Sequence, residues 1–250
     1  MKRCTYLLTA LLLWGMLTVP AGAARRSVPV QADGKAVTSA AYVEQGVTYV
    51  PLRALLTALG GWEVWWDSGN GQAAAASQSG SLRADPAANT VTVSGRTLPS
   101  RVTVERGVTY VPLRLVCEAL GCRVEWDPYL GGAAVTSPGA AYDAGELYWL
   151  ARIIYAESGG ESITGQIAVG NVILNRVKSS QFPDTVEGVI FDRKDAVQFE
   201  PVGNGRIYQT PSAQSVEAAK RALDGENVVG SALYFYAPAL SQGTWINANC

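Results

Sequence analysis

The octapeptide Gly46-Val-Thr-Tyr-Val-Pro-Leu-Arg53 recurs letter for letter as Gly107-Val-Thr-Tyr-Val-Pro-Leu-Arg114, 61 residues further along the chain. In each copy the Val-Thr-Tyr-Val stretch predicts a strand, and the Pro-Leu-Arg that follows predicts a helix with proline at its first position. A repeat of this length indicates duplicated structure and is weak support for any particular chemistry. It therefore predicts that this part of the chain is a duplicated α+β unit.

Both copies continue with the same order of elements. Apolar runs at residues 54–60 and 115–121 predict helices that end at glycine. Short aromatic strands are expected next, at residues 62–67 and 123–127. Residues 68–81 are rich in Gly, Ala, Ser and Gln, which predicts a long mobile loop inside the first half.

Both copies of the octapeptide carry a family resemblance. Tyr49, Arg53, Tyr110 and Arg114 are interpreted as packing and turn residues rather than a site. Through the two Val-Thr-Tyr-Val-Pro-Leu-Arg segments, residues 28–136 resemble the stalk-type N-terminal domain of copper amine oxidases, which recurs in secreted bacterial proteins. The resemblance implies an α+β adaptor or wall-associated module. It does not imply copper, because the sequence has no histidine.

The composition excludes several chemistries. The 250 residues include four Cys and no His, and 20 Lys plus Arg oppose 21 Asp plus Glu. Without His there is no Ser-His-Asp triad, no Cys-His dyad and no imidazole ligand, and a cysteine-only zinc site needs four suitably spaced thiolates. We therefore expect no metal and no cofactor, and acid-base chemistry is left to carboxylates, Tyr or Lys. A net charge of −1 gives no reason to expect a nucleic-acid partner.

The first residues predict a secretory signal. Lys2 and Arg3 precede a mostly apolar run over residues 6–19, and Ala21-Gly22-Ala23 offers a cleavage site after Ala23. The run is shorter than the roughly 20 residues that a membrane-spanning helix needs. We expect a secreted protein of the cell wall or spore envelope, with membrane contact only through the signal before cleavage. In that oxidising setting a Cys117–Cys122 disulfide is allowed, and Cys250 could compete for either partner.

Residues 131–141, between the two halves, have small, uncharged side chains, which indicates a linker. The expected division is a signal peptide at 1–23, the duplicated stalk-type domain at 28–136, a linker at 137–142 and a second domain at 143–250.

The second domain is expected to open with a helix that carries an acid on its apolar face. Asp143 and Glu146 fit a capping box. The inward stripe that follows consists of Leu147, Leu150, Ile153 and Ile154. Glu157 continues this stripe in the last turn, before Ser158-Gly159-Gly160 ends the helix. Desolvation and the helix C-terminus both push the carboxyl pKa upward, as a general acid requires.

Two other interpretations of Glu157 stay open on spacing alone. It could pair with Arg152 or Arg176 in a structural salt bridge, or it could point into water. Beyond it, Ser162 or Thr164 could cap a second helix, residues 216–223 predict another, and residues 233–236 predict a strand edge with exposed aromatic faces.

Eight ordered motifs over about 100 residues carry a second resemblance. They are Tyr155-Ala-Glu157 with Gly160-Glu161, Gly165-Gln-Ile-Ala-Val169, Asn175-Arg176-Val177, Phe182-Pro183, Val189-Ile190, Gln198-Phe199, Pro201, and Ala232-Leu-Tyr-Phe-Tyr236 with Pro238. Together they resemble the cell wall hydrolase domain of SleB-type spore cortex-lytic enzymes. The resemblance implies a small lysozyme-like, mainly helical domain that cuts peptidoglycan between N-acetylmuramic acid and N-acetylglucosamine, with Glu157 as the catalytic glutamate.

The resemblance also favours a lytic transglycosylase, which needs one carboxyl group acting as acid and then as base. Hydrolysis would need a second carboxylate, for which Glu161, Glu200 and Asp195 are the candidates. The residues expected to line the glycan groove are Tyr155, Gln198, Phe199, Tyr234 and Tyr236, with Asn175 orienting the site.

Family members continue beyond a Trp-containing segment, here Trp245-Ile246, into a Gly-x-His-x-Phe ending, whereas this sequence stops at Cys250. Whether the sequence is truncated stays open. That departure keeps an inactive peptidoglycan-binding envelope protein as an alternative, beside a hydrolytic muramidase and, less favoured, an amidase, which would need zinc ligands. The expected partner is the peptidoglycan glycan strand. Spore cortex or vegetative wall as the substrate, and any regulatory protein, are undetermined.

Overall fold

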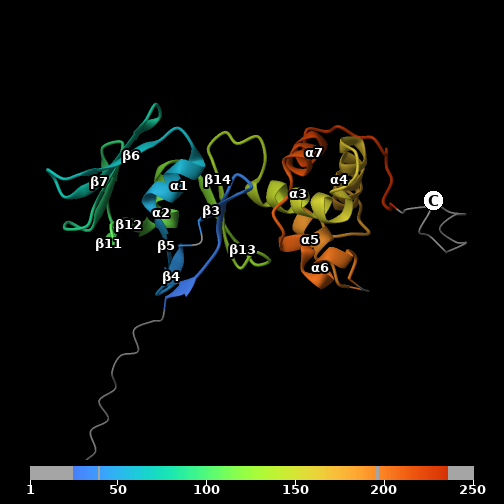
Figure 1. Cartoon of the computed structure of the whole chain (residues 1–250), viewed down its shortest axis with the longest axis horizontal. Helices are drawn as coiled ribbons and strands as arrows, with labels where there is room; N and C mark the ends of the chain where they lie inside the picture. The colour runs from blue at the N-terminus through green and yellow to red at the C-terminus, as the bar shows by residue number, and fades with distance from the viewer. Residues whose placement is uncertain (1–24, 39, 195–196, 236–250) are drawn as a thin grey trace, which may run out of the picture.

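The computed structural model describes residues 25–38, 40–194 and 197–235, in which a part built from β-sheets precedes a helical part (Figure 1). The expected mixed α+β architecture is confirmed at this level. The expected signal peptide lies outside the described residues, as do Asp195, Tyr236, Trp245 and Cys250.

The two copies of the octapeptide pair with each other at the centre of the first sheet. This antiparallel sheet has the strand order β1-β4-β5-β12-β11, with bounds Arg26–Ser27, Tyr42–Glu44, Val47–Pro51, Val108–Pro112 and Thr103–Glu105. Val50 lies opposite Val111, flanked by the pairs Tyr49–Pro112 and Pro51–Tyr110. Because Val50 faces its own counterpart, Val111, and the two flanking pairs are counterparts of each other, a local two-fold rotation relates β5 to β12.

The same part of the chain contains two further sheets beside this central one. One is an antiparallel meander in the order β10-β9-β8-β7-β6, with bounds Arg96–Pro99, Thr90–Val93, Gly80–Asp85, Gln72–Ser77 and Glu63–Asp67. The other has the order β13-β14-β2-β3, with bounds Arg123–Asp127, Gly132–Thr136, Val30–Ala32 and Lys35–Thr38. The expected mobile loop at 68–81 is wrong, because β7 and the start of β8 occupy it. Ala73, Ala74 and Ala75 are buried and pair with the aromatic strand β6, a contact that composition alone does not reveal.

Helices α1, Leu52–Leu59, and α2, Leu113–Ala119, follow the octapeptide strands as expected. The two prolines, however, end the strands and occupy the N-cap position instead of the first helical position. At either position the missing N–H costs little, since that donor has no intrahelical partner. Each helix buries three side chains in the core of this part of the chain; these are Leu52, Leu55 and Leu56 in α1, and Leu113, Val116 and Cys117 in α2.

Cys117 and Cys122 are both buried and stand as free thiols, so the disulfide that the sequence allowed is not formed in this structure. The backbone N–H of Cys122 donates to the Cys117 carbonyl at 2.8 Å across the end of α2.

The helical part has its own core. Its elements are α3 Ala144–Ser158, α4 Ile163–Val177, α5 Val186–Ile190, α6 Glu200–Asn204, the 3-10 turn η1 Arg206–Tyr208, and α7 Ala213–Leu223. Asp143 caps α3 and Ser162 caps α4, as predicted. The strand expected from residue 233 is not present up to residue 235, where the described chain runs without a strand partner. Within the described ranges no helix is long and apolar enough to span a bilayer.

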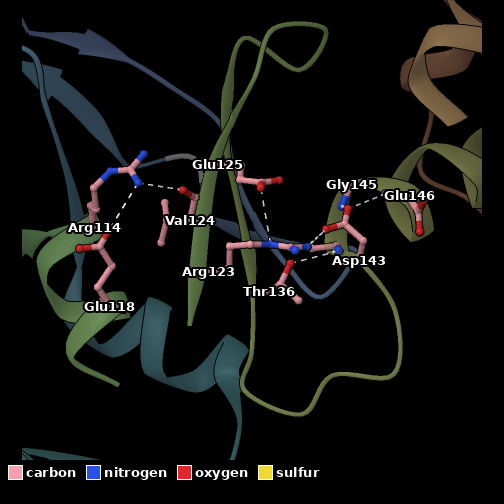
Figure 2. A network of polar contacts seen from close by, with 10 residues as sticks. Arg114, Glu118, Arg123, Val124, Glu125, Thr136, Asp143, Gly145 and Glu146 are labelled. Atoms are coloured by element: carbon pink, nitrogen blue, oxygen red, sulfur yellow. Dashed lines mark hydrogen bonds and ion pairs between the residues drawn. The ribbon is translucent and has the colours of Figure 1, made fainter. Parts of the chain in front are cut away.

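Side chains from both parts meet at a junction between β13 and α3. The Trp149 indole N–H donates to Asp127 at 2.7 Å, and the rings of Tyr129 and Phe191 stack with centroids 4.2 Å apart. Arg123 on β13 pairs with Asp143, the residue that caps α3 (Figure 2). The sheet part therefore contacts the first turns of α3, the helix that carries Glu157 in its last turn.

Candidate active site around Glu157

Glu157 lies in the last turn of α3, where the sequence predicted it. The four residues of the inward stripe are all buried, and Glu157 itself is half-buried. The carbonyls of the last turn are already satisfied. Ser158 Oγ donates to the Ile154 carbonyl at 2.8 Å, and the Gly159 N–H donates to that of Tyr155 at 2.9 Å. These hydrogen bonds fix the last turn of α3. They place the carboxyl group of Glu157 at the edge of the helical core.

Burial raises the pKa of the Glu157 carboxyl, and the nearby charge of Glu200 raises this pKa further, while the charge of Arg206 opposes both effects. The direction agrees with the expectation from the apolar stripe. No ion pair joins Glu157 to Arg152 or Arg176 within the described part of the chain, so a structural salt bridge has no support there. A carboxyl with a raised pKa retains its proton to higher pH than a free glutamate does, which suits a general acid.

Arg206 is a neighbour of Glu157 that sequence reasoning missed. Gly205 has φ 82°, a left-handed conformation that ends α6 and starts the 3-10 turn carrying Arg206. From there the guanidinium donates to the Ala156 carbonyl, at the negative end of the α3 dipole. The two residues are 49 positions apart, so no local spacing signal could have indicated their contact.

Asn175 and Arg176 at the end of α4 hold the segment that carries Tyr234. Asn175 Nδ2 donates to the carbonyls of Gly230 and Ala232, at 2.8 and 3.0 Å. Arg176 Nε donates to the Leu233 carbonyl at 2.8 Å. The Arg176 guanidinium also lies within 4.9 to 5.4 Å of three ring centroids, those of Phe182, Phe199 and Tyr234. Side chains of α4 therefore satisfy carbonyls of this segment, which has no strand partner up to residue 235.

The residues expected to line a glycan groove differ in exposure. Tyr234 is 59% exposed and Gln198 is exposed, whereas Tyr155 is half-buried. Phe199 is only 3% exposed and packs in the core of the helical part, so it supports the surface instead of forming it. Asn175 contacts the segment 230–232 rather than Glu157. Tyr236 lies outside the described residues.

Of the other carboxylates considered, Glu161 is exposed in the turn after α3, where its carbonyl accepts from the side chains of Gln166 and Gln214. Glu200 begins α6 and is the carboxylate whose charge acts on Glu157. No group of three or more Cys, Asp or Glu side chains in the described ranges is arranged to hold a metal ion.

A second half-buried acid lies at the junction between the two parts of the chain. Burial raises the pKa of Glu187 on α5 to about 7, and the charges of Asp127, Asp143 and Glu146 add to the effect. These four acids line a cavity of about 490 Å³, together with Arg123, Trp126 and Tyr129. Figure 2 shows how Arg123 ties the strand side of this cavity to the start of α3.

We expect the protein to lose stability as the pH rises from about 4.5 to about 7. In that window the folded protein holds a proton on Glu187 that the unfolded chain has released, so the free energy of unfolding falls. Glu187→Gln should reduce this fall by about 1 to 3 kcal/mol, and this is measurable by urea unfolding at pH 5 and pH 8. Glu63→Gln, at an exposed position on β6, is the matched control. An unchanged pH dependence in Glu187→Gln would contradict the assignment.

Comparison with known proteins gives two family matches, one in each part of the chain. The cell wall hydrolase family matches residues 160–250, and the copper amine oxidase N-terminal domain matches residues 31–131. The spore cortex-lytic enzyme of Bacillus cereus is 41% identical over 105 residues, which are 42% of this chain and 39% of the relative. That of Bacillus subtilis is 36% identical over 113 residues, 45% of this chain and 36% of the relative. The chain thus spans about two fifths of the length of these curated relatives.

Among solved structures, the catalytic domain of the germination-specific lytic transglycosylase SleB from Bacillus anthracis is 40% identical. The match covers 44% of this chain and 88% of that domain, with a TM-score of 0.40. Residues 160–250 therefore carry a match to the cell wall hydrolase family, and residues 31–131 ahead of them carry a match to the copper amine oxidase N-terminal domain.

Proposed function

We propose that this protein cleaves peptidoglycan glycan strands between N-acetylmuramic acid and N-acetylglucosamine as a lytic transglycosylase, with Glu157 as its single general acid and base. The observation that carries the proposal is a half-buried carboxyl whose pKa is raised by burial, placed at the end of α3. The match to the cell wall hydrolase family and the names of the curated relatives support peptidoglycan as the substrate.

The chemistry needs one carboxyl group in two protonation states. Protonated Glu157 gives its proton to the glycosidic oxygen as the bond from that oxygen to the muramic C1 breaks. The resulting carboxylate then takes the proton of the muramic C6 hydroxyl, whose oxygen closes onto C1 to form a 1,6-anhydro ring. No water is consumed, and Glu157 ends protonated. Arg206 lies close enough to stabilise the carboxylate between the two steps.

Tyr234 and Gln198 are proposed to contact the glycan, since both are exposed. Tyr155 and Tyr236 remain proposed contacts from the family resemblance. We assign Asn175 a positioning role, because its side chain fixes the carbonyls of the segment that carries Tyr234. Phe199 is proposed to support these contact residues from the core of the helical part.

A hydrolytic muramidase is the second candidate, and one observation favours it. Glu200 is near enough to Glu157 for its charge to raise the Glu157 pKa, so a second carboxylate exists beside the first. In a hydrolase that carboxylate would activate water or stabilise the sugar cation.

We further propose the division at residues 28–136, 137–142 and 143–250, with a cleaved signal at 1–23, a lysozyme-related catalytic domain and an extracytoplasmic location. Separate buried cores support the division, one from Val28 to Val135 and one from Leu147 to Ala219.

Product mass separates the two reactions. We expect purified peptidoglycan digested with the protein to release anhydro-muropeptides one water lighter than hydrolysis products, as measured by mass spectrometry. Products with reducing-end muramic acid would instead establish the hydrolase. Binding without any released fragment would contradict both reactions and leave a wall-binding protein.

A further inference from the structure

The sheet part of the chain contains two similar grooves. The first, groove I, lies between the β4–β5 turn at Gly46–Thr48 and the start of α2 at Pro112–Arg114, with Trp126 of β13 on its wall. The second, groove II, lies between the β11–β12 turn at Gly107–Thr109 and the start of α1 at Pro51–Arg53, with Trp66 of β6 on its wall. Their volumes are about 320 and 530 Å³. Each is large enough for a small ligand, which typically occupies about 300 to 1,000 Å³.

The two grooves are counterparts under the local two-fold rotation. Four segments of groove I have equivalents in groove II: the octapeptide turn of one copy, the helix start of the other copy, the tryptophan strand, and the alanine beside it. This exchange follows from the antiparallel pairing of β5 with β12, which brings the turn of one copy beside the helix of the other. The same pairing sets the two turns at opposite ends of the central strand pair.

An exposed tryptophan stands at the same place in both grooves. Trp126 is 46% exposed and Trp66 is 47% exposed, and each pairs with an alanine of the neighbouring strand, Ala133 or Ala73. These alanines also line the grooves and are too small to cover an indole ring. Exposed Val47 and Val108 lie at matching positions, as the first residues of β5 and β12. The same exposed tryptophan therefore recurs in both grooves. Such a recurrence indicates a binding surface more strongly than single scattered exposed residues do.

A cation accompanies each tryptophan. Arg53 is the one charged residue described in the lining of groove II. In groove I, Arg26 and Arg114 outnumber Glu125, so both grooves carry a net positive charge. Arg114 donates to the Val124 carbonyl at 2.9 Å and pairs with Glu118, which holds its guanidinium beside β13 (Figure 2).

We propose that grooves I and II are two equivalent binding sites for acidic glycan strands, and that they tether the protein to peptidoglycan. The apolar C–H face of a pyranose ring stacks on an indole, as apolar groups pack on aromatic faces generally. The arginines match the carboxylates on the peptide stems of that polymer. A repeating polymer presents the same unit many times, so it can occupy two equivalent grooves of one chain or bridge two strands. The choice of peptidoglycan as the bound polymer rests on the proposed function, whereas the presence of two equivalent grooves does not.

The test is co-sedimentation of the full chain with purified, protein-free peptidoglycan sacculi. All variants carry Glu157→Gln so that the polymer is not consumed. We expect Trp66→Ala and Trp126→Ala each to raise the apparent Kd roughly threefold to tenfold. The double variant should raise it roughly 100-fold, because two-site attachment is lost. Val104→Ala, on an exposed apolar side chain outside both grooves, is the matched control and should bind unchanged.

Two further measurements keep the result specific. Circular dichroism melting shows whether the double variant is folded, and Trp66→Tyr with Trp126→Tyr should restore most of the binding, because a ring platform is restored. Arg53→Ala should weaken binding to native sacculi but have little effect on sacculi whose carboxylates have been amidated. Arg83→Ala, at an exposed arginine of β8, should affect neither.

A folded double alanine variant that binds sacculi like its parent would overturn the proposal. An equal effect of Arg53→Ala on native and amidated sacculi would overturn the role assigned to charge. Fragment release is measured separately on the chain with Glu157 intact. If no fragments appear but the two tryptophans govern binding, the proposed activity fails and the two binding sites stand. If fragments appear and binding does not depend on the tryptophans, the activity stands and the two binding sites fail.

Discussion

Replacing Glu157 by Gln is expected to lower the rate of fragment release from purified peptidoglycan by roughly 100- to 10,000-fold, the range that one general acid-base group contributes. Gln has nearly the shape of a protonated Glu but cannot give up or take a proton. Because the group is half-buried in the last turn of α3, the change should leave the circular dichroism spectrum and melting temperature close to those of the parent. Release is measured as soluble muropeptides per unit time at matched protein concentration.

Glu161→Gln is the matched control for this experiment, since Glu161 lies four residues further on and is exposed. It should retain nearly full activity. Glu200→Gln discriminates between mechanisms: a transglycosylase with one acid tolerates it with a modest change, whereas a two-carboxylate hydrolase loses most of its rate. Full activity in a folded Glu157→Gln protein would remove Glu157 from the mechanism.

The same carboxyl sets the pH dependence of the acid step. Its pKa is raised mainly by burial, so the protonated form persists to higher pH than in a free glutamate. The acid-dependent rate should therefore fall as the pH rises through that raised value.

Trp149→Ala is expected to have the largest effect on stability, about 3 to 5 kcal/mol in the free energy of unfolding, as for other buried Trp truncations. The side chain is 0% exposed, and its ring packs edge-on against Tyr148 and Phe191. Its indole N–H also donates to Asp127 on β13, so the variant removes a contact between the two parts of the chain. Urea unfolding followed by far-ultraviolet circular dichroism measures the loss.

Trp149→Phe separates packing from the hydrogen bond. It keeps most of the buried apolar surface and leaves Asp127 with its two backbone donors, the N–H groups of Tyr129 and Leu130. We expect this variant to cost about 1 to 3 kcal/mol, the range for an unpaired buried polar group. A change below about 1 kcal/mol in Trp149→Ala would show that the side chain is not part of the stabilising core.

Much of the local structure follows from residues close together in the sequence. The cap of α3 at Asp143 and its end after Ser158 depend on nearby side chains and glycine, so the sequence predicted them correctly. The raised pKa of Glu157 was predicted for the same reason, because the apolar stripe that buries it lies on its own helix. Predictions failed where partners are distant. The alanine-rich residues 72–77 became a buried strand only because β6 and β8 pair with them.

The sequence alone determined that the chain has a repeated octapeptide followed by a helix with one acid on its apolar face, since periodicity, caps and repeats are local properties. Only the tertiary structure decided that the two copies pair with each other, that Arg206 and Glu200 act on Glu157, and that Asn175 and Arg176 donate to carbonyls of the Tyr234 segment. Each of these depends on contacts between residues far apart in the chain, and such contacts form through packing and loop closure rather than through any local preference.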